Sequence, residues 1–163
     1  MRYLKIFIAL FFFYTNSLVY AQCPCQNLKR DDGTTVFQCE ASPVSFDRSH
    51  QLGLSLASNG QETYVGLTVR FLNESKDIVD DLSIRLKDNN MITLDFVKSQ
   101  RSYIGNSNVT LALFYVDAID ARKIGASGLY TLTFSFNDKV VRTYECDQNT
   151  NVLISQMKCL STQ

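Results

Sequence analysis

Hydrophobic and polar residues alternate through most of the chain after residue 50, a pattern typical of strands with one buried face. Leu52, Leu54 and Leu56 share one face of the first such run. The turn 58–61 contains Asn-Gly, which tolerates positive φ and therefore predicts a hairpin. Its second strand, 63–72, places these apolar residues inward: Val65, Leu67, Val69 and Phe71.

The same pattern continues towards the C-terminus and predicts further paired strands. A second hairpin joins 82–87 to 91–97 through Asp88-Asn89-Asn90. The run 109–116 is apolar on both faces, which predicts a central strand. The last pair, 130–136 and 140–145, is expected to bury these residues of its first strand: Tyr130, Leu132, Phe134 and Phe136.

Two segments break the alternation and predict helices. Asp117 is placed to cap a short helix near 117–124, and Gly125 is placed to end it. A C-terminal helix near 149–160 follows from the helical spacing of its apolar residues. We expect this second helix to cover an open end or edge of the sheet.

Hairpins without a strand-helix-strand rhythm predict a mainly β fold, an antiparallel β-sandwich, with a partly closed barrel as the alternative. The run 127–132 resembles the corner between strands E and F of immunoglobulin-like domains, in which a tyrosine hydroxyl, here that of Tyr130, bonds to upstream backbone. The sequence has no Trp, and Leu132 stands where an antibody domain carries its second sheet-bridging cysteine. The sandwich is therefore expected to be immunoglobulin-like or related, and not of the antibody type.

The first residues predict export. Basic residues precede an apolar run over 6–14, and small Ala21 follows, so 1–21 is expected to be a signal peptide cleaved after Ala21. Polar residues at 15–17 interrupt the run well short of the ~20 residues that span a bilayer, so no membrane span is expected. The run 19–22 resembles the end of a soluble bacterial export signal, which implies a secreted or periplasmic protein.

The remainder suits one domain, in which a partly extended, cysteine-containing segment, 22–50, shares one core with 51–163. Cysteines in an oxidising compartment are expected to pair structurally. We expect Cys39 to bond with Cys23 or Cys25, and Cys146 with Cys159, leaving one cysteine over. Other pairings stay open at this point.

Composition and charge argue against a nucleic-acid partner. The chain has 16 basic and 16 acidic residues, and removing 1–21 takes away two basic residues and no acidic one. The surface is then close to neutral, without the basic face that phosphate contacts require.

Reactive groups are few. His50 is the single histidine, and neighbouring Asp47 and Ser49 form no recognised triad, so we interpret His50 as a polar loop residue. Cys23-Pro24-Cys25 has one residue fewer between its cysteines than the usual redox motif. Zinc held by Cys23, Cys25 and Cys39 would lack a fourth ligand, and no cofactor is predicted.

Acidic turns offer oxygen ligands to calcium at 31–33, 80–81 and 88–90, but none has the spacing of a calcium loop, and turn chemistry accounts for all three. Asn73 and Asn108 stand in sequons that would accept glycans in a eukaryotic secretory route. Several aromatic residues could form a patch for a partner or a carbohydrate, although core packing accounts for most of them: Tyr64, Tyr103, Phe114, Tyr115 and Tyr130.

Without a catalytic motif, the sequence favours a non-enzymatic exported protein that binds a protein or a cell-envelope component. Two alternatives stay open. One is a small-ligand carrier with an apolar cavity between its sheets. The other is a hydrolase whose paired carboxylates are too scattered in the sequence to recognise.

Overall fold

The computed structural model describes residues 25–29 and 33–162. The signal peptide predicted at 1–21 and Cys23 lie outside these residues. Ten strands and two helices make up the described fold. The strands are β1 Cys25–Lys29, β2 Thr35–Cys39, β3 Ser42–Phe46, β4 His50–Ser58, β5 Thr63–Phe71, β6 Leu82–Leu86, β7 Met91–Ile104, β8 Ser107–Val116, β9 Leu129–Ser135 and β10 Val141–Glu145, and the helices are α2 Ala118–Ala126 and α3 Val152–Ser161.

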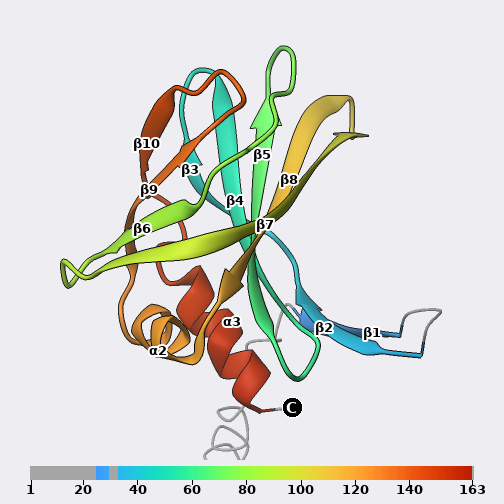
Figure 1. The fold of residues 1–163 in the computed structure, drawn as a ribbon, viewed down its shortest axis with the longest axis vertical. Helices are drawn as coiled ribbons and strands as arrows, with labels where there is room; N and C mark the ends of the chain where they lie inside the picture. The colour runs from blue at the N-terminus through green and yellow to red at the C-terminus, as the bar shows by residue number, and fades with distance from the viewer. Residues whose placement is uncertain (1–24, 30–32, 163) are drawn as a thin grey trace, which may run out of the picture.

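The strands form one open antiparallel sheet in the order β1-β2-β4-β5-β8-β7-β6-β9-β10, with β3 pairing with β4 beside this path. The part built from β4, β5 and β8 crosses the part built from β6, β9 and β10 at a steep angle, and long β7 belongs to both (Figure 1). The prediction of a mainly β, antiparallel fold is confirmed. The sheet is open, and an immunoglobulin-like arrangement is not established by this topology.

The core lies between the two crossing parts of the sheet, as the alternation of the sequence predicts. Leu52, Leu54 and Leu56 are fully buried, and the inward residues of β5 are buried as well. Leu82, Ile84 and Leu86 of β6 close the core from the other part. Strand β8 is central, because β5 and β7 pair with its two edges.

The buried side expected for β9 is right for its later residues and wrong for Tyr130. Leu132, Phe134 and Phe136 are buried, whereas Tyr130 is exposed and Leu129 takes the inward position. The register between β6 and β9 shifts at this point, and this irregularity turns the tyrosine outward. The guanidinium of Arg85 lies 5.5 Å from the centre of the Tyr130 ring. Within the described chain the Tyr130 hydroxyl donates no bond to backbone, so the resemblance to an immunoglobulin corner is not supported.

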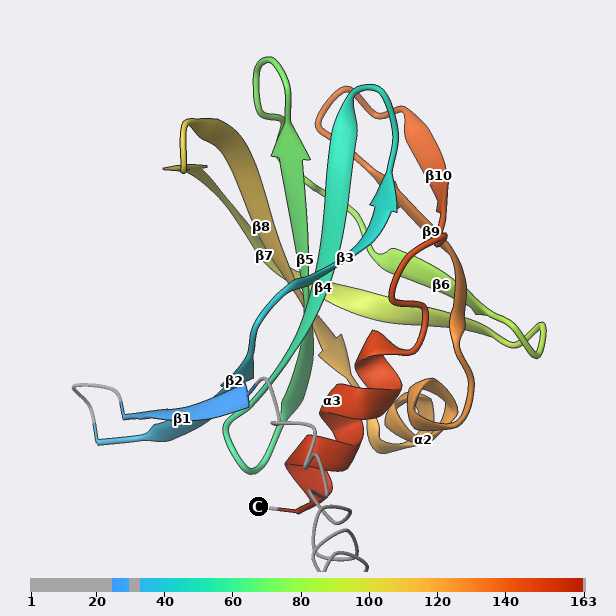
Figure 2. The same ribbon diagram turned by 180° about the vertical axis from the view of Figure 1, so that it is seen from behind.

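Both predicted helices are present, with shifted ends. Asp117 caps α2, since its Oδ1 accepts from the backbone N–H groups of Ile119 and Asp120 at 2.8 and 2.7 Å. Gly125 does not end the helix, which continues to Ala126. The two helices pack together at one end of the sheet (Figures 1 and 2), and Ile124 of α2 and Leu153 of α3 belong to the core.

Three strands occupy the segment expected to be only partly extended. The β1–β2 hairpin projects from the body on the same side as the β7–β8 hairpin (Figures 1 and 2). Strand β7 runs well beyond the expected end at residue 97, and the backbone of Gly105 and Asn106, with φ of 55° and 60°, forms its turn into β8. A Gly-Asn pair is a recognised hairpin signal, and it indicates a turn at this position.

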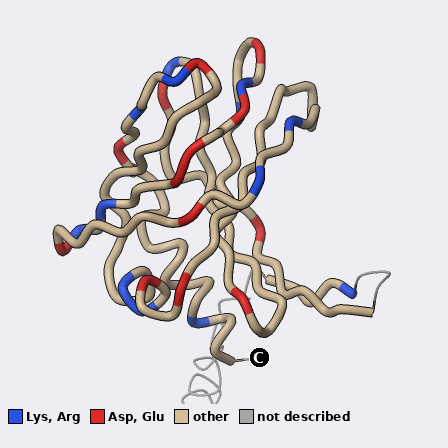
Figure 3. The backbone as a smooth tube through the Cα atoms, in the orientation of Figure 1, with Lys and Arg blue, Asp and Glu red and all other residues tan. Residues whose placement is uncertain are grey.

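Charged residues of both signs are spread over the described fold (Figure 3). The densest ion pairing joins Asp138 to Arg142 and Lys76, at 2.7 Å each. Hydrogen bonds from these two cations hold the pKa of Asp138 well below its usual range. Neither helix of the described residues is long and apolar enough to cross a membrane.

Candidate binding surface

His50 lies in an aromatic cluster and not in a loop. It begins β4, and its ring packs against Phe71, Phe136 and Tyr144 with centroid distances of 5.2, 5.8 and 5.9 Å. Its Nδ1 atom is 3.6 Å from Asp47 Oδ1. The carboxylate of Asp47 accepts the backbone N–H groups at residues 49 and 50, each at 2.6 Å. The arrangement ties the start of β4 to β10 across the core, which is a structural role.

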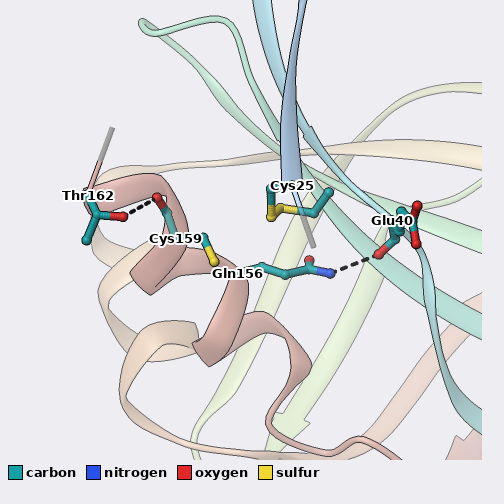
Figure 4. The surroundings of a disulfide bond; sticks show 6 residues. Cys25, Glu40, Gln156, Cys159 and Thr162 are labelled. Atoms are coloured by element: carbon teal, nitrogen blue, oxygen red, sulfur yellow. Dashed lines mark hydrogen bonds between the residues drawn. A yellow bond between two sulfur atoms is a disulfide. The ribbon is translucent and has the colours of Figure 1, made fainter. Parts of the chain in front are cut away.

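The cysteines pair differently from the expectation in one respect. Cys25 and Cys39 are register partners in the β1–β2 hairpin and form a disulfide, as expected. Cys146 is free and buried, so the expected bond between Cys146 and Cys159 is wrong. Cys159 is itself disulfide-bonded. Nearby, Gln156 of α3 donates to the carbonyl of Glu40 at 3.0 Å, which fixes the helix beside the hairpin (Figure 4).

The Cys146 thiol is expected to resist alkylation in the native protein. Burial raises the pKa of the Cys146 thiol to about 12, so the reactive thiolate is scarce at pH 8, and only 6% of the residue is exposed. Alkylation followed by peptide mass spectrometry should label Cys146 only after denaturation. Cys25, Cys39 and Cys159 should be labelled only after reduction as well. Rapid labelling of Cys146 in native protein would contradict this environment.

The described acidic turn residues make local hydrogen bonds. Asp80 accepts a hydrogen bond from the Ser135 hydroxyl, and Asp81 accepts one from the backbone N–H of Phe96. Asp88 bonds within its own turn, to Asn90. The turn at 31–33 lies largely outside the described residues. No group of three potential metal-binding side chains occurs within the part of the chain that the structure describes.

Among the five aromatic candidates, the structure brings together only Tyr64 and Tyr115. These two are register partners on β5 and β8, and their rings pack edge to face with centroids 6.1 Å apart. Both lie on the outward face of the sheet, opposite the core. Tyr103 and Tyr130 are exposed elsewhere, and Phe114 is fully buried.

That outward face carries three adjoining hollows of about 220, 260 and 220 Å³. The first and second share Ala57 and Leu113, and the second and third share Thr68. They form one continuous depression over β4 and β5, which we call the outer-face groove. Between Ser58 and Gln51 of β4 it is roughly 23 Å long, at about 3.3 Å per strand residue.

Small residues keep the floor of the outer-face groove low. Ser55 of β4 and Gly66 of β5 are register partners in its centre, and Ala57 lies beside them. A Cβ atom at Gly66 would stand 2.6 Å from the Ser55 hydroxyl oxygen, much closer than van der Waals contact allows. Gly66 has no positive φ, so space and not backbone conformation accounts for a glycine here.

Larger side chains form the walls. Val36 and Gln38 of β2 stand on one side, and Leu111 and Leu113 of β8 stand on the other. Leu111 is 40% exposed, although it lies in the middle of a central strand. The apolar outward side of β8 is therefore part of the groove and not of a second core.

A bulge in β7 completes the wall beyond β8. The register between β7 and β8 shifts between Phe96 and Lys98, so Val97 is an extra residue. An extra residue re-aims the side chains that follow it. Both Val97 and Lys98 line the groove as a result, while Phe96 packs against Phe114 of the core.

The described lining of the groove carries cations and no acids. Lys98 lies along its length and Arg70 lies at its far end, and no Asp or Glu among the described residues lines any of the three hollows. Among the described residues, neither cation takes part in an ion pair or a side-chain hydrogen bond. Their charges are available to a bound molecule.

A larger hollow of about 560 Å³ adjoins the groove at the β4–β5 turn and is also lined by the β1–β2 hairpin and by Leu160 of α3. The side chains of Ser58 and Asn59, two of its lining residues, are engaged within that turn. The Ser58 hydroxyl donates to the Glu62 carbonyl at 2.9 Å, and Asn59 Oδ1 accepts from the backbone N–H groups of Gln61 and Glu62 at 3.0 and 2.7 Å. We therefore place the candidate site in the groove.

One feature of the sequence indicates this groove. Ser55, Ala57 and Gly66 are small residues at outward positions of two predicted partner strands. Small outward residues on adjacent strands indicate a place where another chain approaches closely. Comparison with protein-family models, curated proteins and solved structures finds no match.

Proposed function

We propose that the protein is an exported binding module, built on a β-sandwich-like scaffold, that holds an extended segment of a partner protein in its outer-face groove. Export stays a prediction from the first residues of the sequence, and the Cys25–Cys39 disulfide supports it. No observation among the described residues favours the carrier or hydrolase alternatives over binding.

The observation that supports the proposal is the outer-face groove. Leucine, valine and tyrosine side chains around a floor of small residues are not expected on a sheet face that contacts only water. Exposed apolar surface of this kind marks interaction sites, because water contact with it is unfavourable. Its length of roughly 23 Å suits about seven residues of extended chain.

Filling the groove should abolish binding. Ala57→Trp places a large ring between the walls, at a half-buried outward position shared by two hollows. The matched control is Val141→Trp, on β10 at a position that is 67% exposed and outside the groove. The probe is a displayed library of random 12-residue peptides, selected on the immobilised mature protein.

Selected peptides are expected to bind wild type and Val141→Trp equally and to bind Ala57→Trp at least tenfold more weakly. Thermal unfolding confirms that each variant is folded, and Thr68→Trp serves as a second filling variant. Peptides that bind all variants alike, or a selection that enriches no peptide, would contradict the proposal.

A further inference from the structure

We propose that the outer-face groove selects an acidic segment, with apolar side chains at its centre and carboxylates near Lys98 and Arg70. This inference rests on the proposed function. The occupant is a peptide whose charge is opposite to that of the groove.

The charges of the groove favour an acidic segment. The whole chain has equal numbers of acidic and basic residues, yet the described lining of the groove includes Lys98 and Arg70 and no acid. A carboxylate bound near either cation would meet an attractive potential, and a basic segment would meet like charge there. At the Tyr64 end the carboxylate of Glu62 accepts from the tyrosine hydroxyl, so the attraction is centred on Lys98 and Arg70.

The separation of Lys98 and Arg70 also fits an extended segment with two carboxylates. Lys98 pairs with Leu113, Leu113 pairs with Gly66, and Arg70 lies four residues beyond Gly66 on β5. Two strand spacings of about 4.8 Å and four residues of about 3.3 Å separate the two backbones by roughly 16 Å. Carboxylates four to six residues apart in an extended segment match that separation.

Polar groups in the groove favour a peptide over a lipid. Gln38, Gln51 and Gln100 line it and form no side-chain hydrogen bond within the described part of the chain. Each amide offers a donor and an acceptor, as does every residue of an extended backbone. An acyl chain in the same place would offer these amides no hydrogen-bond partner, whereas a peptide backbone would.

The test uses the peptides selected above. Enriched sequences are expected to carry Asp or Glu on both sides of an apolar centre. Lys98→Glu and Arg70→Glu should each weaken their binding roughly tenfold, because an attractive pair becomes a repulsive one. The control is Lys139→Glu in the β9–β10 turn, which makes the same charge change outside the groove and should leave binding unchanged.

Reversal of the peptide charge completes the test. Replacing the acidic residue nearest Lys98 by lysine should weaken binding to wild type and restore binding to Lys98→Glu. Selected peptides that bind Ala57→Trp more weakly than wild type but are neutral or basic would overturn this inference and leave the proposed function standing. A selection without groove-dependent peptides would overturn both. Phosphatidylglycerol vesicles are the second probe, and groove-dependent binding to them alone would overturn the peptide assignment.

Discussion

Replacing Phe114 by alanine is expected to lower the free energy of unfolding by about 3–5 kcal/mol, since this is the usual cost of removing a buried phenylalanine ring. Phe114 is fully buried on central strand β8, and its ring lies 6.0 Å from that of Phe96. Strands β5 and β7 flank it, so the surroundings have little freedom to collapse into the cavity. Urea denaturation followed by circular dichroism measures the loss.

The neighbouring residue supplies the control. Tyr115 lies on the opposite face of β8 and is 38% exposed. Tyr115→Ala should therefore cost much less than Phe114→Ala, although both remove an aromatic ring from the same strand. Equal losses from the two substitutions would contradict the assignment of the inward and outward faces of β8.

Alternation made the inward and outward faces predictable because each strand has a period of two and one face of it must leave water. The buried sets of β4, β5 and β6 follow directly from it. The central place of β8 also follows, since its two faces are both apolar. The helix capped by Asp117 was visible for a different reason, since capping is a local interaction between a side chain and the next turn.

Irregularities of register were not predictable in the same way. The shifts at Tyr130 and Val97 depend on how one strand meets its neighbour, and alternation within a single strand carries no information about that. For the same reason the continuation of β7 to Ile104 was missed, because residues 98–104 are mostly polar and pair with β8 outside the core. Cysteine pairing was only half predictable, since closeness in sequence suggested a bond between Cys146 and Cys159, whereas the tertiary structure leaves Cys146 free and buried.

The outer-face groove combines residues from six strands, β2, β3, β4, β5, β7 and β8, whose order in the sheet is not their order in the sequence. Lys98 and Arg70 line the same groove only because β8 pairs with both β5 and β7. A single sequence gives the residue types and their faces. The arrangement that makes them a site requires the strand order.

Replacing Cys25 and Cys39 together by serine is expected to destabilise the β1–β2 hairpin by about 3 kcal/mol, the chain-entropy estimate for a loop of about this size. The two cysteines are 14 residues apart. Most of β1 is exposed, and β2 meets β4 in only two register pairs, so the disulfide supplies much of what holds β1 against β2. Hydrogen exchange should rise over 25–29 and 35–39, while β5 and β8 stay protected.

The same double substitution also tests the groove, because Val36 and Gln38 of β2 form one of its walls. Selected peptides should bind the serine variant more weakly although the rest of the protein is folded. Cys146→Ser is the matched control, since it removes a free thiol from outside the groove. Unchanged peptide affinity after loss of hairpin protection would show that β2 is not part of the binding surface, and the site would then be confined to β3, β4, β5, β7 and β8.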